Sequence, residues 1–146
     1  MNRSASPWPQ RRDADLTPRS AEFSRTRTSR LMEVLDSNVQ GNVHGGVIMR
    51  MVDEAAGIVA IKHAQQTVVT AAVERFDFVA PAYLGNVVYI DCELERVGRT
   101  SMQVAVKVTA EDLVTRDLRE VARSSVIYVA IDEDGKPTPV PPLAPS

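Results

Sequence analysis

Apolar residues recur along the chain with two different periods, and these predict one helix and a series of strands. From Gly45 to His63 apolar side chains fall on every side of a helix with 3.6 residues per turn. Such a segment predicts a core helix that other elements must cover. Alternation of apolar and polar residues predicts strands at residues 27–35, 67–78, 86–97, 100–111 and 121–132.

The alternation also indicates which side chains share a face. In the third and fourth predicted strands the apolar faces are Val88, Ile90, Cys92 and Leu94, and Met102, Val104, Val106 and Val108. In the last strand the residues in phase are Val121, Ile127, Val129 and Ile131. Short links between the last four strands imply antiparallel pairing. We therefore expect an α+β fold in which a curved sheet wraps around the helix, with a partner subunit covering the remaining apolar face.

Composition narrows the class of protein. The chain has 146 residues, of which 44% are hydrophobic and 25% charged, as expected for a single globular domain. Arg50, Asp53 and Glu54 interrupt its longest apolar segment, so we expect no membrane span, and no secretory signal is seen near Met1. The single cysteine, Cys92, excludes an internal disulfide and favours a cytoplasmic setting.

Charge and proline content divide the chain into three parts. Residues 1–30 hold seven arginines and three acids, which leaves 10 basic and 16 acidic residues elsewhere. We expect residues 1–27 to form a weakly ordered arm rich in arginine and proline, residues 28–136 the folded domain, and residues 137–146 a proline-rich tail. The arm lacks the amphipathic pattern of a transit peptide.

A glycine-bearing segment, Asn38 to Gly46, leads into the predicted helix. It fits neither the dinucleotide-binding pattern nor the P-loop pattern. Free backbone N–H groups at a helix start nevertheless favour an anion, which can be a phosphate or an oxyanion that develops during a reaction.

Two adjacent acids interrupt the apolar helix. Arg50, Asp53, Glu54 and Gly57 share one face, because residues three and four apart are neighbours on a helix. One interpretation is an ion pair between Arg50 and one acid, with the other acid solvated. The other is that one acid faces a cleft and acts as a base or nucleophile.

Other chemistry has less support. His44 and His63 lack the spacing of a metal site, and no Gly-x-Ser-x-Gly elbow is present. Arg99, Thr100 and Ser101 follow a tight glycine turn, where they either serve the turn or contact a phosphate, and Arg75 is a weaker candidate of the same kind.

Several motifs in order resemble the hot-dog acyl-coenzyme A thioesterases, in particular the cytosolic, brain-type and bacterial short-chain hydrolases. They are Asn-x-x-Gly-Asn-Val-His-Gly-Gly-x-Ile-Met-x-x-x-Asp-Glu-Ala from residue 38, Val-Thr-Ala at 69–71, Phe-Asp-Phe-Val-Ala-Pro-Ala-Tyr-Leu-Gly at 76–85, Val-Gly-Arg-Thr-Ser-Met at 97–102 and the ending at 128–137. The resemblance covers about residues 28–143.

The resemblance implies a hot-dog fold, a homodimer with a continuous sheet, and often further assembly to hexamers. It places the catalytic acid on Asp53 and the catalytic asparagine on Asn38, supplied by opposite subunits, and it implies that the N–H of Gly46 meets the thioester oxygen. It brings Arg99 and Ser101 to the coenzyme A phosphates.

We add four candidate substrate contacts: His44, Gly45, Glu54 and Arg75. The substrate is then acyl-CoA, attacked by water with Asp53 as general base or by Asp53 itself, without a metal or cofactor and with no nucleic acid or membrane partner. Two alternatives share the fold, a hydroxyacyl-thioester dehydratase, which would need a histidine within the helix, and a non-catalytic acyl-CoA sensor, which would need an output module. A third is a structural dimer in which Asp53 pairs with Arg50.

Overall fold

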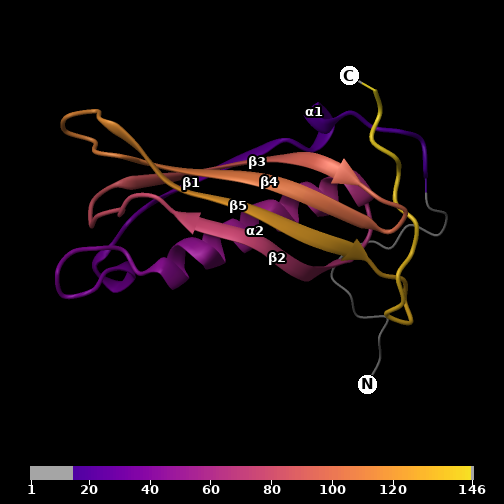
Figure 1. The fold of residues 1–146 in the computed structure, drawn as a ribbon, viewed down its shortest axis with the longest axis horizontal. Helices are drawn as coiled ribbons and strands as arrows, with labels where there is room; N and C mark the ends of the chain where they lie inside the picture. Colours follow the sequence, from indigo (N-terminus) through magenta and orange to yellow (C-terminus); the bar gives the residue numbers. More distant parts are fainter. Residues whose placement is uncertain (1–14, 146) are drawn as a thin grey trace.

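A long helix, α2 (Gly45–Ala64), lies against one face of a five-stranded antiparallel sheet (Figure 1). The computed structural model describes residues 15–145. The remaining elements are α1 (Ala21–Ser24), β1 (Thr26–Leu31), η2 (Val34–Asp36), β2 (Val68–Phe78), β3 (Val87–Val97), β4 (Ser101–Glu111) and β5 (Leu118–Ala130). The sheet order is β1-β3-β4-β5-β2, so β1 and β2 form its two edges. The predicted α+β hot-dog architecture is confirmed.

The helix and three of the strands lie close to their predicted ranges, but the first strand is shorter. The chain leaves the sheet after Leu31, because the Asp36 side chain accepts the backbone N–H of Glu33 at 2.8 Å and closes the short helix η2. Val34 and Leu35, expected to be strand, and Asp36, expected to begin a loop, are therefore helical. At the other end of α2, Gln65 takes a left-handed conformation (φ 54°) and ends the helix.

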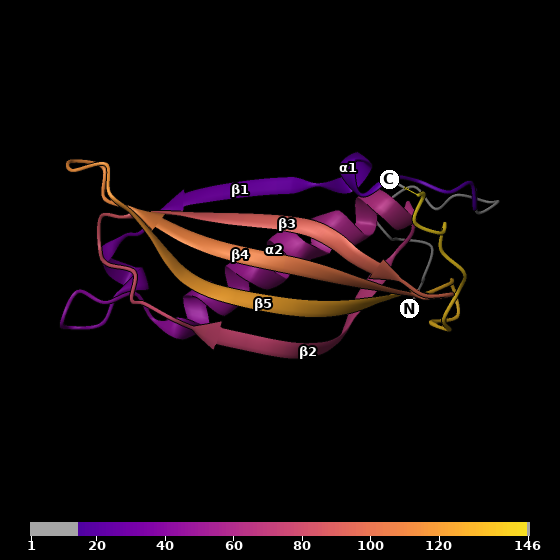
Figure 2. The ribbon, with the colours of Figure 1, turned by 45° about the horizontal axis from the view of Figure 1, so that its top comes forward.

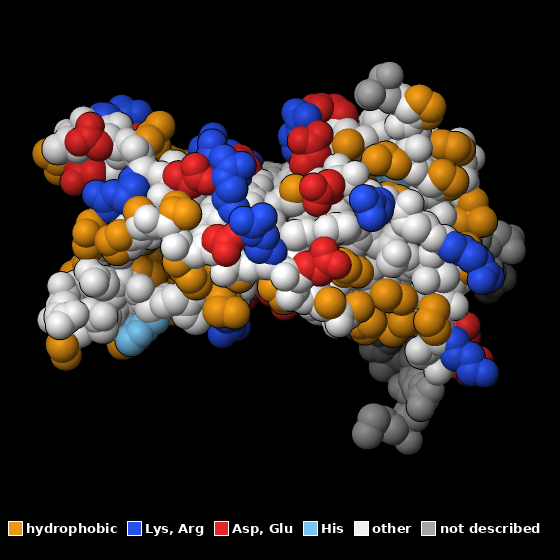
Figure 3. Space-filling model, in the orientation of Figure 1, with side chains coloured by type: hydrophobic (Ala, Val, Ile, Leu, Met, Phe, Trp, Pro, Cys, Tyr) orange, Lys and Arg blue, Asp and Glu red, His pale blue; other side chains and the backbone are white. Residues whose placement is uncertain are grey.

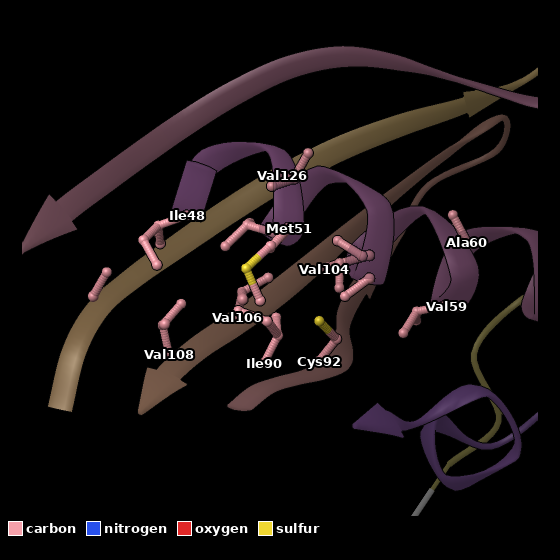
Figure 4. Packing of buried hydrophobic residues seen from close by; sticks show 14 of the residues in the cluster. Ile48, Met51, Val59, Ala60, Ile90, Cys92, Val104, Val106, Val108 and Val126 are labelled. Atoms are coloured by element: carbon pink, nitrogen blue, oxygen red, sulfur yellow. The ribbon is translucent and has the colours of Figure 1, made fainter. Parts of the chain in front are cut away.

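The inner faces of β3 and β4 form the core as the alternation predicted. Val88, Ile90, Val104 and Val108 have no exposed surface, and Cys92 is 2% exposed. Figure 4 shows Ile90, Cys92, Val104 and Val108 on the strands facing the helix residues Ile48, Met51, Val59 and Ala60. Burial of this apolar area is the main force that fixes the helix on the sheet.

The inner face of β5 differs from the prediction. A register shift between Val108 and Thr109 in its pairing with β4 changes the alternation near Val121. Val126 and Tyr128 therefore point into the core, while Ile127 and Val129 are half-buried on the outer face. The prediction that Ile127 and Val129 share a face with buried Val121 was wrong, and the residue that the shift brings inside is Tyr128.

One side of α2 stays open in the single chain. Met49, Ile58 and Ile61 on the helix are 36–46% exposed, although the sequence predicted a helix covered all round. Figure 2 shows β2 curving past the helix as a sheet edge, and most of this strand is exposed. No helix in the part of the chain that the structure describes is long and apolar enough to cross a membrane.

The first and last segments that the structure describes meet beside the C-terminal end of α2. Arg19 donates a side-chain hydrogen bond to the carbonyl of His63 at 2.7 Å, and its backbone bonds to the C-terminal segment at Pro142 and Ala144. The boundary expected at residue 28 falls inside β1, which begins at Thr26. Of the predicted arm, residues 1–14 lie outside the described residues.

Candidate active site

The start of α2 presents two backbone donors. Gly45 and Gly46 open the helix, and their N–H groups have no acceptor among the described residues. A Cβ at Gly45 would lie 3.3 Å from the Phe78 ring, so the chain passes close to β2 there. Gly46 has open space around its Cα, and His44 is exposed just before it. The positive end of the helix dipole is therefore accessible to an anionic oxygen.

A buried acid fixes the loop before the helix. Asp36 accepts two hydrogen bonds from the Arg30 guanidinium, at 3.0 and 3.1 Å, and its backbone carbonyl accepts the N–H of His44 at 2.9 Å. The backbone N–H of Glu33 and then Arg30 hold the pKa of Asp36 below its usual value. The hydrogen bond between Asp36 and His44 thus ties together the two ends of the loop, which limits where Asn38 can move.

Asn38 is held so that only its amide nitrogen remains available. Its Oδ1 accepts the N–H groups of Gln40 (2.9 Å) and Asn42 (3.1 Å), a local turn that consumes the oxygen. No partner for Nδ2 is seen among the described residues, and the residue is exposed. Asn38 can therefore donate to a substrate or a water molecule.

Asp53 lies on the exposed side of α2, and its carboxylate forms no ion pair with a cation among residues 15–145. Its Oδ1 accepts hydrogen bonds from Oγ1 of Thr70 on β2 and from the hydroxyl of Tyr128 on β5, both at 2.9 Å. Neutral donors hold the carboxylate in place without cancelling its charge. This arrangement leaves it able to accept a proton or to attack an electrophile.

Arg50 pairs with the other acid. Its Nε lies 2.9 Å from Oε1 of Glu54, one turn along the helix, and both side chains are exposed. Of the two interpretations drawn from the sequence, the ion pair therefore involves Glu54 and leaves Asp53 out. Glu54 was also expected to contact substrate, and within the described chain it is engaged with Arg50 instead.

The three expected catalytic groups do not meet in one chain. Gly46 and Asp53 are seven residues apart on α2, which corresponds to about 10 Å along the helix axis. Asn38 lies in the loop beyond the helix start and makes no contact with Asp53. Each of these groups is exposed on the open side of the single chain or at its end.

An apolar pocket of about 440 Å³ opens beside the helix start. Its lining residues are Val43, Gly45, Ile48, Phe78, Val79, Ala80, Pro81, Ala82 and Val121. It contains no charged side chain, and Gly45 places it next to the free N–H groups. The pocket can therefore take a hydrocarbon group attached to an atom bound at those donors.

The expected phosphate contacts lie elsewhere. Arg99 and Ser101 occupy the β3–β4 turn, at the end of the sheet opposite the start of α2 (Figure 1). Arg99 is exposed, and its carbonyl accepts the N–H of Val140 at 2.9 Å. Arg75 on β2 forms an ion pair with Asp77, so its charge is already partnered.

A larger hollow of about 1020 Å³ lies on the outer face of the sheet, away from α2. Figure 3 shows acidic and basic side chains mixed over the middle of this face. These charges have local partners: Arg123 pairs with Glu120, and Glu74 accepts a hydrogen bond from the neutral amide of Gln103. Of the predicted site residues, only Arg75 lines this hollow, and none of the expected catalytic residues does.

Two residues that reach Asp53 were not among the predicted site residues. Thr70 lies within a motif of the family resemblance, so its polar side chain in an apolar strand could have indicated the role. Tyr128 is 2% exposed and appears in sequence as one more apolar strand position. No local pattern distinguishes it, because its inward direction depends on the register shift.

The chain matches the thioesterase superfamily over residues 40–116. It is 37% identical over 119 residues to a Bacillus subtilis (strain 168) protein named uncharacterized acyl-CoA thioester hydrolase YkhA, which covers 82% of this chain and 69% of that protein. It is 34% identical over 130 residues to the cytosolic acyl coenzyme A thioester hydrolase of Rattus norvegicus. The match covers 88% of this chain, which spans about a third (34%) of that relative's length.

Solved structures agree with these matches. A hexameric acyl-CoA thioesterase in its apo form has a TM-score of 0.86 at 37% identity, covering 89% of this chain and 83% of that one. The Staphylococcus aureus acyl-CoA hydrolase in complex with butyryl coenzyme A, coenzyme A and coenzyme A disulfide has a TM-score of 0.82 at 32% identity, covering 88% and 78%. Variants of the latter with an aspartate, a threonine or an asparagine changed to alanine also match.

Proposed function

The chain belongs to the thioesterase superfamily, and we propose that it hydrolyses acyl-coenzyme A to a free carboxylic acid and coenzyme A. The observation that carries this proposal is the Asp53 carboxylate, held by two hydroxyl groups and free of any cationic partner among the described residues. A relative with the same fold is a hydrolase solved with butyryl coenzyme A, which supports the substrate class.

In the general-base route, Asp53 takes a proton from water as the water oxygen bonds to the thioester carbonyl carbon. The carbonyl oxygen becomes an oxyanion and accepts the N–H of Gly46, where the helix dipole favours negative charge. The tetrahedral intermediate collapses, the carbon–sulfur bond breaks, and the thiolate of coenzyme A leaves and takes up a proton.

In the nucleophilic route, an Asp53 oxygen bonds to the carbonyl carbon, coenzyme A leaves, and water then hydrolyses the mixed anhydride. Both routes require an ionised, correctly directed Asp53 carboxylate. Asn38 donates its amide N–H to the carbonyl oxygen or to the attacking water, because its own oxygen is occupied within the loop.

The spacing of the polar residues supports these assignments. Asn38, Asp53 and Thr70 have the same separations along the chain as the asparagine, aspartate and threonine changed to alanine in the S. aureus hydrolase. We therefore infer that Thr70 belongs to the site together with the two residues that the sequence suggested.

We infer that two subunits complete the site. Gly46 lies about 10 Å along α2 from Asp53 of the same chain, and Asn38 makes no hydrogen bond to Asp53, so a partner subunit must supply one side. The open face of α2 and the exposed strand β2 form the surface available for that partner. A hexameric relative supports further assembly as a trimer of dimers.

The two ends of the substrate have separate places. The acyl chain enters the apolar pocket beside Gly45 and Phe78, directly next to the bound carbonyl group. We propose that the coenzyme A phosphates reach the β3–β4 turn with Arg99 and Ser101 from another subunit, because within one chain this turn lies at the end of the sheet opposite Gly46. With a relative named as cytosolic and one buried cysteine, we place the activity in the cytoplasm.

Thiol release from acyl-CoAs of increasing chain length tests the proposal. Burial raises the pKa of the Cys92 thiol to about 12, so a thiol reagent at neutral pH reports only the released coenzyme A. We expect steady release with at least one chain length. A shift in melting temperature without thiol release would instead indicate a sensor, and an enoyl product from a 3-hydroxyacyl-CoA would indicate a dehydratase.

A further inference from the structure

Tyr128 brings a hydroxyl group into an otherwise apolar layer between α2 and the sheet. Tyr128 is the largest fully buried side chain in the described core. Its neighbours on the inner faces of the sheet are mostly valines and alanines. Burying a hydroxyl without a hydrogen-bond partner costs free energy, so the partners of this hydroxyl indicate its role. Its oxygen lies 2.8 Å from the carbonyl of Asp53 and 2.9 Å from Oδ1 of the same residue.

The single proton of this hydroxyl is therefore shared between two oxygens of one residue. Burial, followed by the hydrogen bond to Asp53, raises the pKa of Tyr128 well above its usual value, so the hydroxyl stays protonated and acts as a donor. Gly57 allows this approach, because a Cβ there would already touch the Tyr128 ring at 3.7 Å. A larger side chain one turn after Asp53 would push the ring away.

Thr70 and Tyr128 donate to the same carboxylate oxygen from two different strands. Thr70 is on the edge strand β2, and Tyr128 is on its neighbour β5. Rotation of the carboxyl group about its Cβ–Cγ bond would break at least one of these bonds. Both bonds go to Oδ1, and Oδ2 has no hydrogen-bond partner among the described residues, so Oδ2 is the oxygen left for chemistry.

We propose that Tyr128 is a positioning residue, which fixes the Asp53 carboxylate so that Oδ2 is the oxygen that takes a proton from water or attacks the thioester. This inference rests on the proposed hydrolase function. It adds a role for a buried strand residue that does not touch the substrate. It also divides the carboxylate into a structural oxygen, Oδ1, and a reacting oxygen, Oδ2.

The test is the Tyr128→Phe variant, which removes one oxygen atom and keeps the ring. The Asp53 carbonyl keeps its place in the helix hydrogen-bond ladder, so the fold is retained. The matched control is Tyr89→Phe, which removes a hydroxyl that donates to Glu111 at 2.6 Å, away from α2. Both variants and wild type are assayed for kcat and KM on one acyl-CoA, with melting temperature and circular dichroism measured in parallel.

We expect Tyr128→Phe to lower kcat about tenfold or more with little change in KM, because a hydrogen bond to a charged group is lost where the reacting oxygen must be directed. The acidic limb of its kcat–pH profile should move to higher pH, which a purely structural role would not cause. Tyr89→Phe should match wild type in both readouts.

Each other result decides against the inference. An unchanged kcat and pH profile in a folded Tyr128→Phe protein, with wild type active and Asp53→Asn inactive, would overturn the positioning role and leave the hydrolase function standing. Equal losses in Tyr128→Phe and Tyr89→Phe would assign the effect to general packing. A wild-type protein that releases no thiol would overturn both the function and the role.

Discussion

Thr70 donates its hydroxyl to Asp53 across 2.9 Å and so joins the edge strand β2 to the middle of α2. This contact crosses from the sheet to the side of the helix that the sheet leaves open. A threonine hydroxyl that points along this line can do little for the core, because Thr70 itself is exposed. We therefore infer that the Thr70 hydroxyl serves mainly to orient the Asp53 carboxylate.

Replacing Thr70 by valine keeps the shape of the side chain and removes the donor. We expect kcat to fall about tenfold to hundredfold, because a hydrogen bond to an ionised group contributes about 1.5–3 kcal/mol. Thr70→Ser should keep most of the activity, since it keeps the hydroxyl. Equal activity of the valine and serine variants would show that the hydrogen bond is unimportant for turnover.

Phe78 should limit the length of the acyl chain. Its ring lies against Gly45 and lines the apolar pocket. In Phe78→Ala the pocket is larger, so kcat/KM should shift toward longer chains, by about fourfold for each added methylene that becomes buried at about 0.8 kcal/mol. Phe23→Ala, which shortens a phenylalanine outside the pocket lining, is the control. An unchanged chain-length profile would place the acyl chain elsewhere.

His63 should make the protein less stable in mild acid. The residue is fully buried, its Nε2 bonds to the carbonyl of Pro141 at 2.7 Å, and its Nδ1 has no partner among the described residues. Burial, with a smaller effect of Arg19, lowers the pKa of His63. The unfolded chain therefore binds a proton below pH about 6.5 while the folded chain resists it, and stability falls as the pH decreases through that region.

Urea unfolding at pH 7 and pH 5 checks this sign. His63→Gln keeps a donor for Pro141 and cannot titrate, so its loss of stability between the two pH values should be smaller than that of wild type. A wild-type protein as stable at pH 5 as at pH 7 would contradict the prediction. Asp36 titrates in a lower range, because its pKa is below the usual value for a carboxyl group, and does not interfere.

Much of the fold followed from local patterns. Alternation gave the inner faces of β3 and β4, where Ile90 and Val104 are fully buried, because successive side chains of a strand point to opposite faces. The start of α2 at Gly45 followed from the glycine pair and the apolar segment after it. The errors occurred where tertiary pairing changes the local period: the register shift opposite Val108 reversed the alternation in β5.

The candidate site, like the fold, could be predicted only where local sequence patterns determine it. Two adjacent acids in an otherwise apolar helix are unusual, and this pattern in the sequence indicated Asp53 and Glu54 as candidates. Which of them pairs with Arg50 depends on side-chain directions around the helix and on Thr70, 17 positions further along the chain. Tyr128 is 75 positions from Asp53. No spacing rule links residues so far apart, so only the assembled sheet could bring it into the site.

Steady-state acyl-CoA hydrolysis by Asp53→Asn measures the central assignment most directly. Asparagine has the same shape and can still accept from Thr70 and Tyr128, but it cannot take the proton or act as the nucleophile. We expect kcat to fall by about 10²–10⁴-fold with the fold and subunit assembly unchanged. Asp91→Asn, which removes an acid paired with Arg27 at 3.3 Å on β3, should retain wild-type activity. Turnover by Asp53→Asn close to that of wild type would contradict the assignment of Asp53 as the general base or nucleophile.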